Sequence, residues 1–425
     1  AHSFTLGCVV LSDPVFRPNM LRLLLLFLAP FISSFETSPD DPLILVQVVI
    51  RHADRSSMGG WATNDSERIL FRGHGHLSDE GIDNSFAQGE AFKKRYGDTG
   101  FIDKRMLPKE IYVRSSPVPR VLMSAASFGA GLFDKTPAGN DRIPPIITVD
   151  DEDDPLLVPP LACAAYWRHV AIQHHLPLLK EEREPQGGLK ALSGGTTNVH
   201  AQIMAMLFSK IPIECEGVPK DLLEAIVAEL PNKQIKMPEA YQKCAEGPAK
   251  KIMYKYLCFL AGACDDYNLE RLRMTSGYLV KTLFDNMAEV LNCTLTACDK
   301  PKLRVYYTHD INVLALAQVF DALDGFDGTA PAYSTALIFE LRNGRFGPYV
   351  RILMKNGQTA PFKYVDKCQL SSVNCSLDVL VEAKKGFTAS EPLTCRGRKA
   401  TNLQLALSSS LPFTLSIVYV LLKLA

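Results

Sequence analysis

The residues with the clearest chemical potential lie between positions 51 and 55, where one imidazole stands among two guanidiniums. The segment reads Arg51-His52-Ala53-Asp54-Arg55. Guanidiniums bind phosphate oxygens through paired donors, and an imidazole held among them can attack phosphorus to form a covalent intermediate. The alternative interpretation is a surface charge cluster with ion pairs to Asp54. Two matching clusters elsewhere in the chain favour an anion site with a nucleophilic histidine.

These two further clusters add a cation and an acid. Arg114 follows a short apolar run and would be a third guanidinium for the same phosphate, whereas Arg120 is expected to be structural. The other cluster is the pair His309-Asp310, which follows another apolar run. A phosphoryl transfer to His52 needs a proton for the departing alkoxide, and Asp310 is a short acid beside a candidate phosphate ligand, His309. Because a His-Asp pair at a helix start is usually only a cap, this assignment depends on the other clusters.

The elements expected to position the clusters are buried strands. Residues 43–50 form a nearly continuous apolar, β-branched run, which is typical of a strand buried on both faces of a parallel sheet. Residues 111–113 and 303–307 are similar runs, and they lead into helical patterns at 121–132 and 311–323. In such sheets ligands bind beyond the carboxyl ends of the strands, near helix N-termini. All three clusters follow strand ends, so we expect them to share one site.

The rest of the folded chain contains a helix, a late strand pair and a helical insertion. Ser78 is a good N-cap for a helix that runs to about Arg95. Residues 336–341 and 349–354 are expected to form a strand pair. The sequence therefore predicts an α/β sheet with helices on both faces, interrupted by a mostly helical lobe. The expected boundaries are 41–154 and 266–400 for the α/β domain and 155–265 for the helical cap.

The composition excludes several classes of protein. The 46 basic and 46 acidic side chains cancel, so no global field attracts nucleic acid and anion recognition must be local. A hydrophobic fraction of 47% with 22% charged residues is typical of a folded chain rather than a disordered one. His74, His76, His174 and His175 lack carboxylate or cysteine partners at ligand spacing, so we expect neither a metal nor another cofactor.

Both ends of the chain carry hydrophobic segments. Met20-Leu21-Arg22 precedes an apolar run and then small residues, the order of a secretory signal peptide, so residues 1–36 are expected to be a leader. The alternative interpretation of that run is a buried helix. Residues 404–425 form a tail that is short for a full membrane span and has a poorly formed spacer for a lipid-anchor signal. We expect this tail to be a membrane tether of unspecified type.

An exported chain with eleven cysteines is expected to contain disulfides rather than redox or metal sites. Setting Cys8 aside leaves an even set whose pairing the spacing alone cannot fix. The set is Cys163, Cys215, Cys244, Cys258, Cys264, Cys293, Cys298, Cys368, Cys375 and Cys395. Sequons at Asn64, Asn292 and Asn374 are consistent with glycosylated surface loops of a secreted glycoprotein.

The clusters also resemble the motifs of a known family, in the same order along the chain. Residues 51–56 look like the Arg-His-Gly-x-Arg signature of the histidine acid phosphatases. This branch of the histidine phosphatase superfamily includes prostatic, lysosomal and venom acid phosphatases and, more distantly, phytases. Residues 75–81 resemble its Gly-x-Leu-Thr-x-x-Gly segment, 112–125 its second arginine segment, and 308–310 its His-Asp motif. The resemblance spans roughly residues 43–395.

This resemblance implies an acid phosphatase that hydrolyses small phosphate monoesters through a phosphohistidine intermediate. The implied roles are His52 as nucleophile, Asp310 as general acid, and Arg51, Arg55, Arg114 and His309 as phosphate ligands. It further implies a mixed, mostly parallel sheet flanked by helices, an inserted helical cap, no cofactor, and frequent homodimers. Together with the export signal, it predicts an extracellular, cell-surface or lysosomal location, with the tail as the tether where the protein is membrane-anchored.

The same likeness implies two disulfides. Cys163 is expected to pair with Cys395, and Cys368 with Cys375. The later member of the family's middle disulfide would fall near Ser334, which is not a cysteine. The six other cysteines of the mature chain therefore stay unassigned.

Two departures from the family signature bear on activity. Ala53 stands where the family has glycine, and Ser57 where it has proline. If position 53 requires a positive φ, alanine costs on the order of 1 kcal/mol or more and could displace His52. The alternative function is therefore a secreted homologue with weak or no activity that serves as an interaction or surface protein. A cofactor-independent phosphomutase of the same superfamily is disfavoured by the export signal and the disulfides.

Overall fold

The computed structural model describes residues 41–133, 143–158, 163–174, 213–219, 222–293, 300–365 and 374–390. All of the helices and strands below belong to one unit of the chain, which begins at Pro42. Of the other unit, residues 1–41, only Asp41 is described. The predicted signal peptide and hydrophobic tail therefore lie outside the described residues. Within the described ranges, no helix has both the length and the apolar character that a membrane crossing needs.

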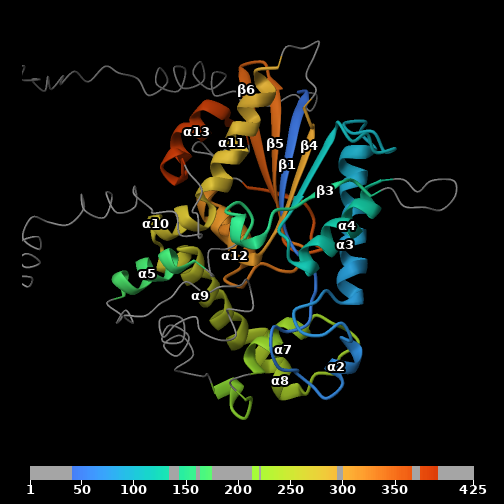
Figure 1. Cartoon of the computed structure of the whole chain (residues 1–425), viewed down its shortest axis with the longest axis vertical. Coiled ribbons are helices and arrows are strands. Elements are labelled where there is room, and N and C mark those ends of the chain that lie inside the picture. Colours follow the sequence, from blue (N-terminus) through green and yellow to red (C-terminus); the bar gives the residue numbers. More distant parts are fainter. Residues whose placement is uncertain are drawn as a thin grey trace, which may run out of the picture. The chain divides into compact units, whose positions relative to one another are not determined.

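A mixed sheet forms the centre of this unit (Figure 1). Its strands are β1 (Leu43–Arg51), β2 (Ile111–Ser115), β3 (Ile146–Ile147), β4 (Leu303–Thr308), β5 (Ala336–Gly344), β6 (Gly347–Lys355), β7 (Lys363–Tyr364) and β8 (Asn374–Ser376). They follow the order β3-β2-β4-β1-β5-β6-β7, and β8 pairs with β6. Strands β1 to β4 are parallel, whereas β5 to β8 pair antiparallel to their neighbours. The predicted α/β fold with a mixed sheet is confirmed.

Strand β1 is buried on both faces, as its continuous apolar sequence predicts. Val46, Val48 and Ile50 belong to one hydrophobic core, and Leu45 and Val49 to another. Side chains alternate between the faces of a strand, so a strand between two cores is apolar at nearly every position; the buried Gln47 is the polar exception, and its side chain is hydrogen-bonded to the Leu283 carbonyl and to Asn286. The nearly continuous apolar run therefore indicates a sheet that is covered on both faces.

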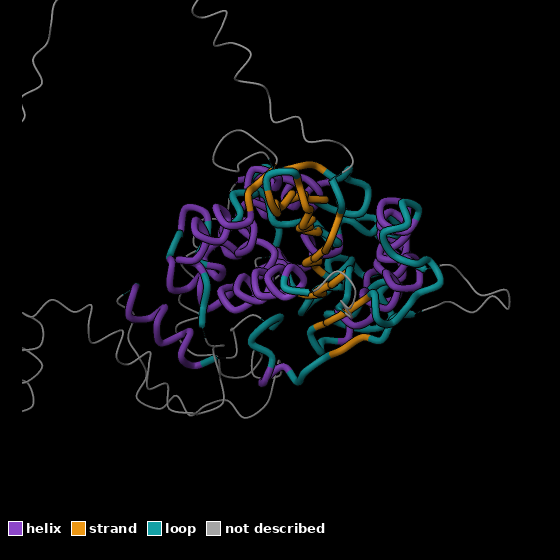
Figure 2. Tube along the Cα trace, turned by 90° about the horizontal axis from the view of Figure 1, so that it is seen from above, coloured by secondary structure: helices purple, strands orange, loops and turns teal. Residues whose placement is uncertain are grey.

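Helices cover both faces of the sheet (Figure 2). The α-helices are α2 (Ser66–Ile69), α3 (Asp79–Phe92), α4 (Pro119–Leu132), α5 (Ala164–Gln173), α7 (Leu223–Glu229), α8 (Glu239–Cys244), α9 (Lys250–Ala261), α10 (Leu269–Leu272), α11 (Tyr278–Leu291), α12 (Asp310–Val319) and α13 (Leu377–Lys384). Helices α3 and α4 pack on the face that carries Val48, whereas α9, α11 and α12 pack on the face that carries Val49.

Shorter helical turns connect or extend these helices. The π-helical turns are η2 (Lys93–Gly97), η8 (Ala245–Ala249) and η10 (Arg273–Gly277). The 3-10 turns are η3 (Asp151–Asp153), η6 (Ile213–Cys215), η9 (Cys264–Asp266), η11 (Leu323–Phe326) and η12 (Lys385–Phe387). Ser78 caps α3, as expected, because its side chain accepts the amide hydrogen of Gly81 at 3.0 Å.

The described part of residues 155–265 is helical and contains no strand, as expected. It packs in two places. Helices α7 and α8 share a small core with Ala62 and Leu70, whereas α9 contributes Leu257 and Phe259 to the core under the sheet. The boundaries predicted for the helical cap stay a prediction.

The structure pairs four of the six cysteines that the sequence left unassigned. The bonds are Cys215–Cys244 and Cys258–Cys264. Cys163 and Cys375 are also disulfide-bonded. Their predicted partners, Cys395 and Cys368, lie outside the described residues, so these two pairings stay predictions.

The predicted glycosylation sites differ in exposure. Asn64 and Asn292 are exposed, whereas Asn374 is partly buried and its side-chain oxygen accepts from Arg351 Nε at 2.7 Å. Glycosylation at the three asparagines stays a prediction.

Candidate active site

The clusters after β1 and β4 meet because these two strands are parallel neighbours in register. Arg51 pairs with Thr308 across the two strands. The His52 amide donates to the Thr308 carbonyl at 3.0 Å, just past the end of each strand. The rings of His52 and His309 lie edge to face with their centroids 5.8 Å apart. Sequence positions more than 250 residues apart thus form one cluster, as predicted.

Arg51 lies in the middle of this cluster and is buried. Its Nη2 forms an ion pair with Asp310 Oδ2 at 2.8 Å, and its Nη1 donates to the Pro331 carbonyl. Its guanidinium carbon lies 4.3 Å from the centroid of the Tyr333 ring, which itself lies 5.9 Å from the His52 ring. The candidate acid and one candidate phosphate ligand are therefore already paired with each other.

Sequence reasoning did not find Tyr333. It lies in the loop before β5, and β5 runs antiparallel to β1 with Ala336 opposite Ile50. The loop that enters such a strand must lie at the carboxyl end of its neighbour, which is where His52 follows β1. Knowing that β5 lies next to β1 would have indicated that this loop lies near His52, but the sequence alone does not give the strand order.

His52 is buried and held as a neutral imidazole. Burial lowers its pKa well below the usual range, and the nearby guanidiniums of Arg120, Arg51 and Arg55 lower it further. Its Nδ1 lies 2.9 Å from the Ala53 carbonyl oxygen. A carbonyl only accepts hydrogen bonds, so Nδ1 carries the hydrogen and Nε2 carries the lone pair. The tautomer is therefore that of a nucleophile at Nε2.

His309 is also buried, and burial followed by the charge of Arg120 lowers its pKa to about 3. Its Nε2 lies 3.1 Å from Ser116 Oγ, a residue just past the end of β2. A neutral imidazole at this place contributes a hydrogen bond rather than a charge. The contact also brings the end of β2 into the site, as the third cluster predicted.

Asp310 begins helix α12, with His309 as the N-cap residue. Burial raises the pKa of its carboxyl, but the guanidiniums of Arg51 and Arg55 outweigh burial and hold the pKa below its usual value. Its Oδ1 accepts the Ile311 amide hydrogen at 3.0 Å. Before a substrate binds, this carboxyl is therefore ionised.

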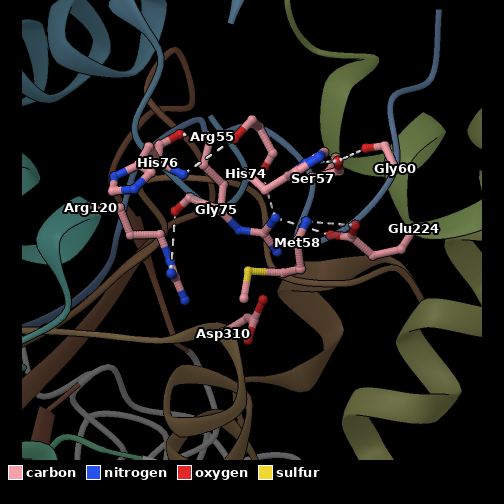
Figure 3. Close-up of polar contacts among 12 residues, drawn as sticks. Arg55, Ser57, Met58, Gly60, His74, Gly75, His76, Arg120, Glu224 and Asp310 are labelled. Carbon is pink, nitrogen blue, oxygen red and sulfur yellow. Dashed lines mark hydrogen bonds and ion pairs between the residues drawn. The ribbon is translucent and has the colours of Figure 1, made fainter. Parts of the chain in front are cut away.

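Arg55 is held by an acid from the helical part of the chain (Figure 3). Its Nη1 lies 3.0 Å from Glu224 Oε1 and donates to the Ser56 carbonyl at 2.7 Å. The other carboxylate oxygen of Glu224 accepts the Met58 amide hydrogen at 3.0 Å. The candidate phosphate ligand Arg55 is thus positioned by helix α7, a contact that the sequence gave no sign of.

Arg120, expected to be structural, is a buried guanidinium at the same cluster. Its Nη1 donates to the Gly75 carbonyl at 3.3 Å, and among the described residues no carboxylate forms an ion pair with it. Burial and the neighbouring charge of Arg55 lower its pKa to about 9. In Figure 3 the guanidinium ends of Arg55 and Arg120 point towards the side on which Asp310 lies. A buried cation without an anionic partner is a ready site for an anion.

Arg114 has partners of its own. It is buried in β2, where its Nη2 forms an ion pair with the buried Asp154 at 2.7 Å and its Nη1 donates to the Ser115 carbonyl. In the described part of the chain, no hydrogen bond or ion pair joins Arg114 to the candidate site residues. The structure therefore places Arg120 with the cluster and leaves the charge of Arg114 balanced by Asp154. The sequence signal for Arg120 was its place in the first turn of the helix after β2.

The departure at position 53 is accommodated without strain. Ala53 is fully buried, and its amide donates to Ser124 Oγ at 3.1 Å. It is not among the non-glycine residues with positive φ. The conformational penalty considered for alanine therefore does not apply here. Ser57 replaces the family's proline and donates its hydroxyl to the Gly60 carbonyl.

The remaining histidines lie apart from any candidate metal centre. His74 stacks on Trp61 with centroids 4.0 Å apart, and its Nδ1 lies 3.4 Å from Ser57 Oγ. Over the part of the chain that the structure describes, no three His, Cys, Asp or Glu side chains are grouped so as to hold a metal ion. His175 lies outside the described residues.

Comparisons with known proteins support the same interpretation. Residues 42–185 match the model of the histidine phosphatase superfamily (branch 2). Putative acid phosphatase 1 of Caenorhabditis elegans is 24% identical over 366 residues, covering 82% of this chain and 81% of that protein. Human testicular acid phosphatase is 27% identical and covers 76% of this chain and 72% of its own length. Lysosomal acid phosphatase of Xenopus laevis is 27% identical, with 80% and 76% covered.

Two solved structures share the fold. Hafnia alvei phytase in complex with tartrate superposes with a TM-score of 0.55 at 15% identity, over 83% of this chain and 99% of that chain. The phytase from Citrobacter braakii superposes with a TM-score of 0.54 at 14% identity, over 82% and 98%.

Proposed function

We propose that the chain is an acid phosphatase of branch 2 of the histidine phosphatase superfamily, and that it hydrolyses phosphate monoesters through a phosphohistidine at His52. The observation that carries this proposal is the convergence at the ends of β1 and β4. There a neutral imidazole lies among buried guanidiniums, with one carboxylate 2.8 Å from the nearest of them. This arrangement provides an anion site, a nucleophile and an acid in one place.

In the first step the phosphoryl group binds to the guanidiniums. We assign this role to Arg51, Arg55 and Arg120, and we place Arg120 where the sequence predicted Arg114. His309 adds a neutral hydrogen-bond partner. Guanidiniums favour phosphate because their planar donors match two of its oxygens, and burial strengthens the interaction. Because these cations cluster around one imidazole, the phosphorus is held in reach of its lone pair.

In the second step His52 Nε2 attacks phosphorus. The N–P bond forms while the bond from phosphorus to the ester oxygen breaks, and Asp310 gives its proton to the departing alkoxide. Water then attacks the phosphohistidine. Asp310, now a carboxylate, takes a proton from that water, so inorganic phosphate leaves and the free imidazole returns.

The low pKa of Asp310 in the empty site is compatible with this role. A phosphate monoester has its second pKa at about 6, so below that pH it arrives mostly as a monoanion that carries one proton. A monoanion beside the carboxylate has the same total protonation as a dianion beside the acid. Binding of phosphate to Arg51 also weakens the ion pair that keeps Asp310 ionised. The site can therefore load Asp310 with the substrate's own proton, which favours activity at acidic pH.

The alternative function, an inactive homologue, was motivated by Ala53. Because Ala53 does not adopt a positive φ, it gives no reason to expect a displaced nucleophile. The chain also has the nucleophile, the acid and the phosphate ligands that the proposed mechanism needs.

The proposal is tested by comparing the wild type with His52→Ala on p-nitrophenyl phosphate at acidic pH. We expect the wild type to release p-nitrophenol and the variant to lose the activity by a factor of about 1,000 or more. Brief incubation with labelled substrate should also give an acid-labile, base-stable label at His52. Equal release of p-nitrophenol by both proteins would contradict the proposal that the protein is a phosphatase with His52 as its nucleophile.

We further propose that the protein acts in the secretory pathway or the lysosome. The disulfides Cys215–Cys244 and Cys258–Cys264 are consistent with an oxidising compartment, and lysosomal and prostatic acid phosphatases are among its relatives. The membrane tether stays a prediction because the tail lies outside the described residues. The homodimer also stays a prediction.

A further inference from the structure

Helix α7 sends one carboxylate to the edge of the site. Glu224, in the first turn of α7, forms the ion pair with Arg55 at 3.0 Å and accepts the Met58 amide hydrogen at 3.0 Å. Its two carboxylate oxygens thus bind two different residues, Arg55 and Met58, which both lie in the segment that follows His52. Figure 3 shows Glu224 reaching this loop from the side opposite to Arg120.

The pairing fixes which edge of the Arg55 guanidinium is left for a ligand. Both hydrogens of Nη1 have acceptors, because Ser56 O takes one at 2.7 Å and Glu224 Oε1 takes the other at 3.0 Å. The Nε of Arg55 is buried and has no hydrogen-bond partner within the described residues. Since a guanidinium is planar, fixing Nη1 also fixes the direction of the Nε–Nη2 edge. That edge carries two parallel donors, the geometry that binds two oxygens of one phosphate.

We infer that Glu224 is a positioning residue, which holds Arg55 so that its Nε–Nη2 edge faces the phosphoryl group. This inference rests on the proposed function and adds to it a contribution from the helical part of the chain. Burial lowers the pKa of Arg55, but the charges of Tyr333 and Glu224 outweigh burial and raise it. The contact with the Met58 amide also ties the adjacent loop to α7.

A second carboxylate of the same helix provides a natural comparison. Glu229, at the end of α7, is buried, and its Oε2 accepts the Ala62 amide hydrogen at 3.1 Å. It holds the same loop further along but makes no described contact with a site arginine. Glu229 therefore shares with Glu224 the structural role of docking the loop, without the contact to Arg55.

The test is a double-mutant cycle of Glu224→Gln and Arg55→Ala, measured by KM and kcat on p-nitrophenyl phosphate and by the inhibition constant of inorganic phosphate. Glutamine keeps the shape of the side chain but loses the charge and one acceptor. We expect Glu224→Gln to raise KM and the phosphate inhibition constant about tenfold while kcat changes less than about threefold, because an orienting contact to a phosphate ligand affects binding throughout the reaction. In the Arg55→Ala background the same substitution should change both by less than about twofold.

Glu229→Gln is the matched control and should leave the phosphate inhibition constant near the wild-type value. If Glu224→Gln does not fold, Glu224→Asp, which withdraws the carboxylate by one methylene, should weaken phosphate binding in the same way. Unchanged or tighter phosphate binding in the Glu224 variants, an equal loss in Glu229→Gln, or a full effect that persists without Arg55 would each overturn the inference. Failure of the proposed function itself would be seen separately, as product release that does not depend on His52.

Discussion

The charge around His52 explains at the level of single residues how a histidine can act as a nucleophile in acid. An ordinary imidazole is protonated below about pH 6.5 and then has no lone pair to offer. Here burial lowers the pKa of His52 well below that value, and the charge of Arg120 is the next contribution. The same guanidiniums that we assign to phosphate binding therefore also keep the nucleophile neutral.

Arg120→Ala should separate these two effects. Removing the cation lets the pKa of His52 rise, so the imidazole becomes protonated at higher pH and the acid limb of the kcat/KM profile shifts towards neutral pH. Loss of one charged phosphate contact should also lower kcat/KM at the optimum by about 10- to 100-fold. The measurement is a pH profile with p-nitrophenyl phosphate.

Arg105→Ala is a suitable control for this change, because Arg105 is exposed and paired with Asp103 on the surface. Its profile should match the wild type. An acid limb that stays in place in Arg120→Ala, despite intact folding, would contradict the electrostatic role of Arg120.

Asp310→Asn tests the acid. The variant cannot donate a proton, so ester cleavage should slow by a factor of about 100 or more for an alkyl phosphate such as glycerol 2-phosphate and far less for p-nitrophenyl phosphate, whose leaving group needs little protonation. The ratio of the two rates is the useful quantity, because a change in phosphate binding through Arg51 affects both substrates. Equal slowing of both would argue against Asp310 as the proton donor.

At the scale of elements, the start of helix α3 supports the loop that carries the site. A Cβ built on Gly81 would lie 2.2 Å from the Asp54 carbonyl oxygen and 3.0 Å from the Asp54 amide nitrogen. Asp54 also accepts the Ser78 amide hydrogen at 2.9 Å. Helix α3 therefore touches the backbone two residues after His52, and the glycine is required by this close approach.

Gly81→Ala should therefore reduce both stability and activity. The added methyl must push α3 away from Asp54, which costs about 1–3 kcal/mol of unfolding free energy and displaces the segment between His52 and Arg55. Urea unfolding and kcat/KM measure the two effects. Gly386→Ala is the control, since nothing lies within 4 Å of its added Cβ, and it should change the unfolding free energy by less than about 0.5 kcal/mol. A stable Gly81→Ala protein with full activity would show that the contact is unimportant.

At the scale of the whole molecule, the site depends on a part of the chain with its own small core. Helix α7 packs with α8 through residues such as Leu223 and Ile226, and the disulfide Cys215–Cys244 encloses α7 within a separation of 29 residues. Glu224 is thus carried by a segment that is stabilised separately from the sheet. We expect the stability of this segment to control phosphate binding.

Replacing Cys215 and Cys244 by serine should test this coupling. In the chain-entropy model the bond contributes about 3–4 kcal/mol, so its loss should promote local opening of α7 and raise KM through the loss of Glu224. Replacing Cys258 and Cys264, which are 6 positions apart, should cost only about 2 kcal/mol and leave KM near the wild-type value. Hydrogen exchange of α7 and KM are the measurements, and an unchanged KM with an open α7 would refute the coupling.

The sequence by itself determined five of the eight strands, β1, β2, β4, β5 and β6, together with the fold class and the meeting of the His52 and Asp310 clusters. These follow from local patterns, because a continuous apolar run marks a doubly covered strand and parallel strands bring their carboxyl ends together. The sequence also predicted an anion site, because arginines clustered around an imidazole provide the donors that bind phosphate oxygens.

Only the tertiary structure showed which side chains surround the candidate site and which partners its arginines have. The sequence assigned Arg114 to the phosphate and Arg120 to a structural role. In the structure Arg114 pairs with Asp154, whereas no carboxylate of the described residues forms an ion pair with Arg120, whose charge lowers the pKa of His52. Tyr333 and Glu224 reach the site through strand order and the packing of α7. The physical reason is that long-range packing sets the partner of a charged side chain, whereas the hydrophobic pattern of a strand can be read from consecutive residues.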